Sequence, residues 1–214
     1  MRKLWVGVLG LMALAGISGA ILFKPVIRPW YLRWGTTAAE QAMVLPGDEI
    51  IGGEGVIVST RAITVQAPVE KVWPWLEQLG QNRGGMFSYE WLENLVGCQM
   101  KNLDHIDPAL QDLRVGDKIL MGPQKGLPYY QVVQIDEPRA LVLVSVDSNT
   151  DQVGTGTWSF ILLPQPGGST RLLIRHRDAP SADQTTNTIN AVFEPVAFVM
   201  EHRMLLTLRD YSEK

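Results

Sequence analysis

Apolar and polar residues alternate in six segments of this chain, with the period of two that is typical of a half-buried strand. Gly, Pro, Asp or Asn separates most of these segments from the next, and such short connections predict antiparallel neighbours. The predicted strands are Val56–Gln66, Lys118–Met121, Tyr129–Asp136, Ala140–Asp147, Thr155–Leu163 and Thr170–Arg177. In the last two strands, the alternation assigns to the inner face Trp158, Phe160, Leu162, Leu172, Ile174 and His176.

Other segments carry apolar residues at intervals of three and four, which predicts amphipathic helices. The first helix is predicted over Pro68–Leu79, and the second over Ser88–Gly97, with Ser88 as its cap and Gly97 as its end. A long C-terminal helix is predicted to have Pro195 near its start. The fold class is therefore α+β, with an antiparallel sheet of about six strands wrapped around the C-terminal helix.

The N-terminal run Leu4–Phe23 contains 20 consecutive uncharged and mostly apolar positions. At about 1.5 Å per residue, a helix of this length spans a hydrocarbon core of roughly 30 Å. Aromatic and cationic residues follow it, a mixture that is typical of the headgroup region: Lys24, Arg28, Trp30, Tyr31, Arg33 and Trp34. The pattern predicts a single-pass anchor in the cell membrane, with the side of the following domain undetermined because cations flank both ends of the run. The competing interpretation is a cleaved signal peptide, since Ser18-Gly19-Ala20 resembles a cleavage site.

The domain organisation follows from these elements. Residues 1–34 form the anchor and interfacial segment, residues 35–55 a connector, and residues 56–214 the folded domain. Within the connector, Thr37 and Glu40 have capping-box spacing for a short helix through Met43. Gly52, Gly53 and Gly55 then predict a flexible joint.

Charge and cysteine content exclude several classes of function. The formal net charge of −3 provides no basic field, so we expect no nucleic-acid partner. Cys98 is the only cysteine, which excludes an intramolecular disulfide and a multi-cysteine zinc site. We predict neither a metal site nor a cofactor.

Four segments carry a family resemblance: RWGTTAAEQAMVLPGDE (33–49), TRAITVQAPVEKVWPWLEQLGQ (60–81), RGGMFSYEWLENLVG (83–97) and FEPVAFVMEHRMLL (193–206). With the element order from about Thr60 to Tyr211, they resemble the helix-grip (SRPBCC) superfamily, which includes START lipid-transfer domains, birch-pollen-allergen proteins and polyketide cyclase/dehydrase-like proteins. The resemblance is to a bacterial branch of mostly uncharacterised members. It implies a ligand cavity between the sheet and the C-terminal helix, and it brings no established catalytic residues.

The candidate ligand-contacting residues are aromatic, sulfur-containing or titratable. Tyr and Trp bury a large area while they keep one polar group for orientation, and Met adapts to apolar ligands. We expect the cavity to be lined by Met86, Tyr89, Trp91, His176, Phe193, Met200 and Met204. The alternative is that the aromatic residues near the second helix only plug the edge of the sheet. His176 and Asp178 also share the inner face, close enough for a network but too far for a direct hydrogen bond.

These features predict a membrane-anchored domain that binds a hydrophobic small molecule or lipid. One alternative is a cyclase/dehydrase-type enzyme, in which the same cavity uses His176, Asp178 or Tyr89 for proton transfer. Another is an interaction module whose cavity is closed by side chains. The fold does not separate these functions, because one scaffold hosts all of them.

Overall fold

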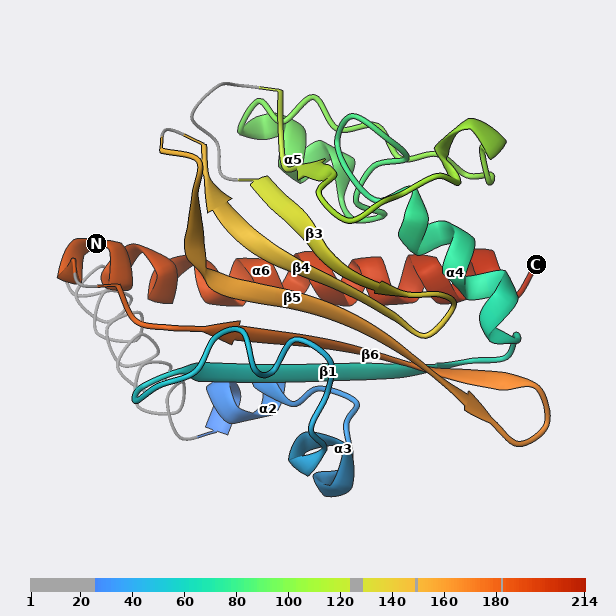
Figure 1. Ribbon diagram of the computed structural model, residues 1–214, viewed down its shortest axis with the longest axis horizontal. Coiled ribbons are helices and arrows are strands. Elements are labelled where there is room, and N and C mark those ends of the chain that lie inside the picture. Colours follow the sequence, from blue (N-terminus) through green and yellow to red (C-terminus); the bar gives the residue numbers. More distant parts are fainter. Residues whose placement is uncertain (1–25, 124–128, 149, 182) are drawn as a thin grey trace, which may run out of the picture.

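The computed structural model describes residues 26–123, 129–148, 150–181 and 183–214. It contains a six-stranded antiparallel sheet in the order β1-β6-β5-β4-β3-β2, with a layer of helices across one face (Figure 1). The strands are β1 (Ile57–Val65), β2 (Lys118–Leu120), β3 (Tyr129–Asp136), β4 (Ala140–Asp147), β5 (Gln152–Gln165) and β6 (Ser169–Asp178). The α+β class and the antiparallel sheet are therefore confirmed.

The helices are α2 (Arg28–Leu32), α3 (Ala38–Ala42), α4 (Val69–Glu77), α5 (Glu90–Leu95), the 3-10 helix η2 (Pro108–Leu110) and α6 (Gln184–Ser212). The predicted capping box starts α3, because Thr37 accepts from the backbone of Glu40 while the Glu40 carboxylate accepts from that of Thr37. The predicted anchor Leu4–Phe23 lies outside the described residues. Among the helices that are described, none combines the length and apolar character that a membrane crossing requires.

The core lies between the inner face of the sheet and the helices α4 and α6. The alternation in β5 and β6 faces as predicted, because the main core cluster contains Trp158, Phe160, Leu162, Leu172 and Ile174. Trp73, Trp158 and Phe160 are all buried, as predicted from the apolar faces of their elements. Trp158 stacks against its cross-strand partner His176, with ring centroids 5.4 Å apart.

Two helix starts differ from the prediction. Helix α6 begins at Gln184, well before Pro195, because the Asp183 carboxylate caps the backbone N–H groups of Thr185 and Thr186. Pro195 therefore sits inside the helix. Helix α5 begins at Glu90, and Ser88 does not cap it, since the Ser88 hydroxyl donates to the carbonyl of Met200 on α6.

The connector packs on the outer face of the sheet. Arg175 on β6 is buried there, and its guanidinium donates to the Asp48 carboxylate at 2.7 Å and to the carbonyl of Met43 at 2.7 Å. Leu45 fills a small second core with outward side chains of the sheet. The segment before β1 is thus joined to β6 by buried polar contacts.

Candidate functional site

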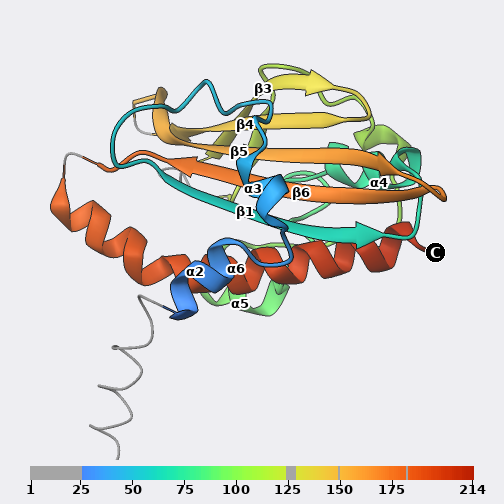
Figure 2. The same ribbon diagram turned by 90° about the horizontal axis from the view of Figure 1, so that it is seen from below.

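The two halves of α6 have different environments. Met204, Leu205 and Leu208 in the C-terminal half are buried against the sheet and α4. In the N-terminal half, five apolar side chains are between 44% and 68% exposed: Ile189, Val192, Phe193, Val196 and Val199. Figure 2 shows the first turns of α6 reaching past the end of β1, while the rest of the helix runs beneath the sheet. The N-terminal half of α6 therefore carries apolar side chains that the described part of the chain does not cover.

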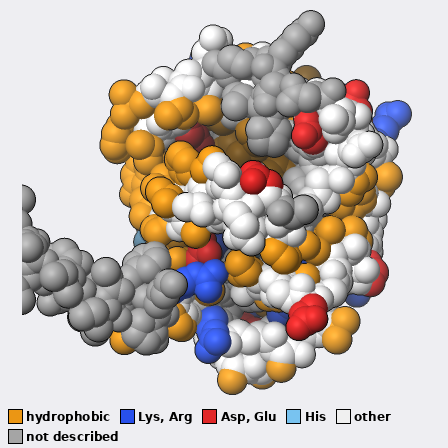
Figure 3. All heavy atoms as spheres, turned by 90° about the vertical axis from the view of Figure 1, so that its left-hand side faces the viewer, with side chains coloured by type: hydrophobic (Ala, Val, Ile, Leu, Met, Phe, Trp, Pro, Cys, Tyr) orange, Lys and Arg blue, Asp and Glu red, His pale blue; other side chains and the backbone are white. Residues whose placement is uncertain are grey.

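This end of the molecule is hollowed. Figure 3 shows hydrophobic side chains around the hollow. The inner face of the sheet here presents Tyr130 from β3, Trp158 from β5 and His176 from β6, and the Trp158 ring lies against the rings of both other residues. Tyr130 and His176 are half-buried, which leaves part of each side chain accessible. We call this region, bounded by these three side chains and the N-terminal half of α6, the open end.

A buried ionic cluster lies beside the open end. Arg61 and Glu201 are only 4% and 5% exposed, although both carry charge. Arg61 Nη1 donates to Glu201 Oε1 at 2.5 Å, and the His176 Nε2 atom is paired with Glu201 Oε2. Burial by itself raises the pKa of the Glu201 carboxyl, but His176 and Arg61 overcome this and hold the pKa below its ordinary value. The cluster therefore joins β1, β6 and α6 through an ionised carboxylate.

Asp178 lies on the inner face with His176, as the alternation predicts. A Cβ added to Gly156 would lie 2.6 Å from Asp178 Oδ1 and 3.5 Å from Ser145 Oγ, so this glycine makes room for both side chains. The hydroxyl of Ser145 accepts from the Gly156 backbone N–H at 3.0 Å. The partner of the His176 imidazole is Glu201 and not Asp178, which agrees with the expected separation of two residues along one strand.

Two polar groups of this wall lie in a poorly hydrated environment. Burial raises the pKa of the Tyr130 hydroxyl, and the charges of Asp178 and Glu201 raise it further. The Trp158 Nε1 atom is buried and has no hydrogen-bond partner within the described ranges. Buried donors are usually satisfied, so this indole N–H is an exception that it shares with Trp73 Nε1 in the core.

The predicted ligand contacts fall into three environments. Met86 and Met204 are buried in the main core. Met200 and Tyr89 are half-buried where the loop before α5 meets α6, and the Arg203 guanidinium lies 5.8 Å from the Tyr89 ring. Phe193 and Trp91 are exposed, on α6 and α5 respectively. Of the seven predicted residues, the structure thus buries Met86 and Met204 and leaves the others partly or largely accessible.

Sequence reasoning missed Arg61 and Glu201. The sequence pattern could have revealed both residues. Arg61 alternates with the inward-facing Ile63 and Val65 along the strand, and Glu201 lies three residues before Met204, on the apolar face of the last helix. A charge at an inward position requires a partner, and here the two charges partner each other.

The segment before β1 is also fastened to the N-terminal half of α6. Arg28 donates to both carboxylate oxygens of Glu194, at 2.9 and 2.8 Å, and the Tyr31 hydroxyl donates to the same carboxylate at 2.5 Å. The Tyr31 ring stacks on Phe198, while Arg61 Nε donates to the Tyr31 carbonyl. Helix α2 is thereby held against both the ionic cluster and α6.

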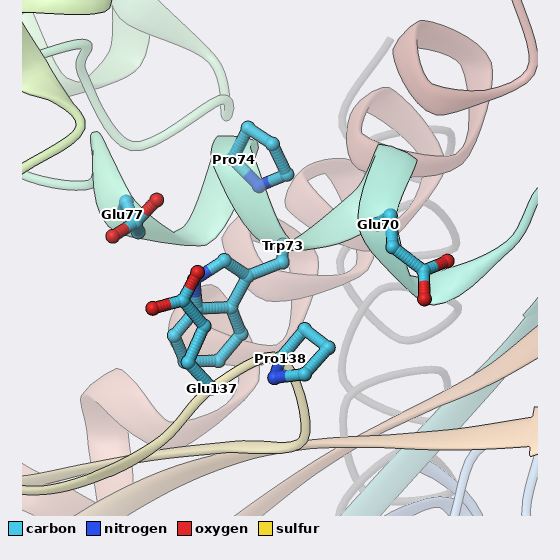
Figure 4. Close-up of a pocket in the computed structure, with 6 residues that line it drawn as sticks. All are labelled: Glu70, Trp73, Pro74, Glu77, Glu137 and Pro138. Atoms are coloured by element: carbon cyan, nitrogen blue, oxygen red, sulfur yellow. The ribbon is translucent and has the colours of Figure 1, made fainter.

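A separate hollow of about 430 Å³ lies between α4 and the β3–β4 turn. Its lining is Glu70, Trp73, Pro74, Glu77, Glu137 and Pro138 (Figure 4). Burial raises the pKa of Glu77, and the neighbouring Glu137 charge raises it further. Within the described part of the chain, no group of three or more acidic, His or Cys side chains is arranged to hold a metal ion.

Comparisons with known proteins show likeness only to solved structures. No protein-family model and no curated protein matches the chain. A Chromobacterium violaceum protein is 18% identical, with a TM-score of 0.45, and the match covers 73% of this chain and 97% of that one. A Bacillus halodurans protein is 17% identical, with a TM-score of 0.45, and the match covers 72% of this chain and 95% of that one. The Aha1 dimer from Colwellia psychrerythraea is 14% identical, with a TM-score of 0.39, and the match covers 73% of this chain and 96% of that one. At these identities and TM-scores, the likeness says nothing about function.

Proposed function

We propose that the chain is a membrane-anchored domain that binds a hydrophobic small molecule or lipid at the open end. The observation that carries this proposal is the exposure of apolar side chains along the N-terminal half of α6. An exposed apolar set of this size is unusual on a monomeric soluble surface and is typical of a binding site. It lies beside an inner sheet face that is otherwise packed.

The wall of the open end suits a ligand with one polar group. Phe193 and Val196 offer apolar area, while the Tyr130 hydroxyl and the half-buried His176 offer hydrogen-bonding groups. Ligand sites usually combine an apolar lining with a few polar groups that fix orientation. An amphiphile with its chain along α6 and its polar end toward Tyr130 satisfies both requirements.

The membrane part of the proposal comes from the sequence. The apolar run ends at Phe23, and α2 begins at Arg28 with an exposed Trp30. Trp beside Arg is typical of a chain at the headgroup level. An anchor there would keep the open end close to the bilayer from which a hydrophobic ligand partitions.

The enzyme alternative has one feature in its favour, the pairing of His176 with a carboxylate. In a general base, a carboxylate that orients the imidazole is a familiar arrangement. Arg61 shares the same carboxylate, however, and the cluster links three elements inside the core. This arrangement supports a structural role for Glu201 and leaves ligand binding as the better-supported function.

Binding of a fluorescent fatty acid to the detergent-purified full chain tests the proposal. Val196→Asp places a charge at the open end, and Val115→Asp is the matched control because Val115 is 62% exposed on the loop before β2. We expect Val196→Asp to weaken binding at least about tenfold, which corresponds to about 1.4 kcal/mol, since a charge replaces buried apolar contact. Equal binding by both variants and the parent chain, with unchanged circular dichroism, would reject the open end as the site.

A further inference from the structure

Helix α5 has the reverse of the usual polarity of a surface helix. Trp91 and Leu95, one turn apart, are 65% and 73% exposed, and Val96 just after the helix is 75% exposed. Its acidic residue Glu93, in contrast, is turned inward, and the Glu93 Oε2 atom is buried without a hydrogen-bond partner. A helix that serves only the core buries its apolar face and exposes its charges.

This reversal has an energetic cost that the fold does not compensate. Burial raises the pKa of Glu93 to about 7, and the charge of Glu90 contributes to the rise. Around neutral pH, the protein therefore keeps a carboxyl group in an unfavourable place while three large apolar side chains face outward. Such an arrangement becomes favourable when an apolar medium covers the outer face of α5.

Helices α2, α6 and α5 form one layer on the face of the molecule opposite the outer surface of the sheet (Figure 2). Trp30 contacts the ring of Phe198 on α6, with centroids 5.4 Å apart, from the α2 side. Ser88, just before α5, donates to the Met200 carbonyl from the other side. The helices α2 and α5, which carry the exposed Trp30, Trp91 and Leu95, are therefore both attached to α6 in one helical layer.

The chain that precedes this layer indicates what covers it. Before residue 26 lie the 20 uncharged positions of Leu4–Phe23, and the described chain enters directly at the helical layer. A segment of this composition partitions into a bilayer, and it is joined to α2 by only a few residues. The apolar medium nearest to the outer face of α5 is then the membrane itself.

We propose that the helical layer docks on a lipid bilayer, with α5 inserting Trp91 and Leu95 at the headgroup level as a second contact beside α2. Aromatic and aliphatic side chains on one face of a helix bind to the interface in this way. The proposal rests on the membrane anchoring in the proposed function, and it is independent of ligand binding. It would hold the open end against the bilayer surface.

Environment-sensitive labels on the full chain in phosphatidylcholine vesicles test the docking. Cys98 is replaced by Ser, and one label is placed at Leu95→Cys. The matched control is Val44→Cys, because Val44 is 90% exposed and lies beside Leu45, which packs on the outer face of the sheet. Each protein is measured with brominated lipid as a quencher in the bilayer, and with iodide as a quencher in water.

We expect the label at position 95 to be quenched by brominated lipid and shielded from iodide, while the label at position 44 shows the opposite. The additional change Trp91→Ser should reduce the lipid quenching at position 95. Iodide quenching of equal strength at both positions would overturn the proposal. Shielding of position 95 from both quenchers would also overturn it, in favour of a second copy of the chain. Recovery of the full chain in the supernatant after vesicle sedimentation would contradict the membrane anchor and with it the docking. Fatty-acid binding in detergent tests the ligand site separately, because it does not depend on the bilayer.

Discussion

Arg61 on β1 and Glu201 on α6 form an ion pair of 2.5 Å in the interior, between residues that are far apart in the sequence. The same carboxylate is paired with His176 on β6. Because each charge is removed from water, the loss of one partner leaves the other uncompensated. The stability of the fold should therefore be sensitive to the loss of either charge of this cluster.

A double-mutant cycle on this pair should show strong coupling. Arg61→Met and Glu201→Leu are each expected to lower the free energy of unfolding by about 3–5 kcal/mol, since each leaves a buried charge. The double variant should cost clearly less than the sum of the two, because both charges are gone. Urea unfolding of the detergent-solubilised full chain measures all four proteins, and additive effects would contradict the ion pair.

The pH dependence of stability should carry the signature of Glu201. Its pKa is lowered in the folded state, so its contribution to stability is complete above the unfolded pKa of about 4.3 and is lost as the pH falls through the lower folded value. We therefore expect acid unfolding of the parent chain to be steeper below about pH 4.5 than that of Glu201→Leu. Parallel stability curves for the two proteins in that range would show that the carboxylate is not held ionised.

The alternation of apolar residues predicted the strands well, because a sheet with one buried face requires it along each strand. The inner faces of β5 and β6 followed from the alternation of Trp158, Phe160 and Leu162 and of Leu172, Ile174 and His176. The beginning of α6 did not follow, since its first turns are rich in Thr and Asn and have no buried stripe. The residue that marks the beginning of α6 is its N-cap Asp183, whereas the prediction placed the beginning near Pro195.

The candidate site was predicted less completely for a different reason. The position of His176 on the inner face follows from local parity, but its partner Glu201 comes from another element. Pairing between elements depends on how α6 crosses the sheet, and a periodic pattern does not contain that information. Trp91 shows the reverse case, since an aromatic residue in a helical pattern was assigned to a cavity and is exposed.

Glu93→Gln should stabilise the protein in alkaline solution. The raised pKa of Glu93, about 7, means that stability falls as the pH rises from the unfolded pKa toward that value, because the folded state must then hold a buried charge. We expect Glu93→Gln to exceed the parent chain by about 1–3 kcal/mol at about pH 8 and to equal it near pH 4. The exposed Glu70 provides the control variant Glu70→Gln. A constant difference at both pH values would assign the effect to packing and not to ionisation.

Arg175 should be important for the attachment of the connector to the sheet. It is 3% exposed, and besides Asp48 and Met43 its guanidinium donates to Thr60 at 3.0 Å and to the Glu40 carbonyl at 2.9 Å. Arg175→Leu leaves these acceptors unpaired, so we expect a loss of about 3 kcal/mol in the free energy of unfolding.

Arg177 is the matched control for this change, because it lies two residues along the same strand on the same outer face. Its guanidinium donates to the Ile51 carbonyl at 2.8 Å and lies 3.8 Å from Asp48, and the side chain remains partly exposed. We expect Arg177→Leu to cost less than about 1 kcal/mol, because a partly hydrated pair contributes little. Amide exchange should also become faster over residues 38–48 in Arg175→Leu only. Equal exchange in the two variants would mean that apolar packing around Leu45 is sufficient to hold the connector on the sheet.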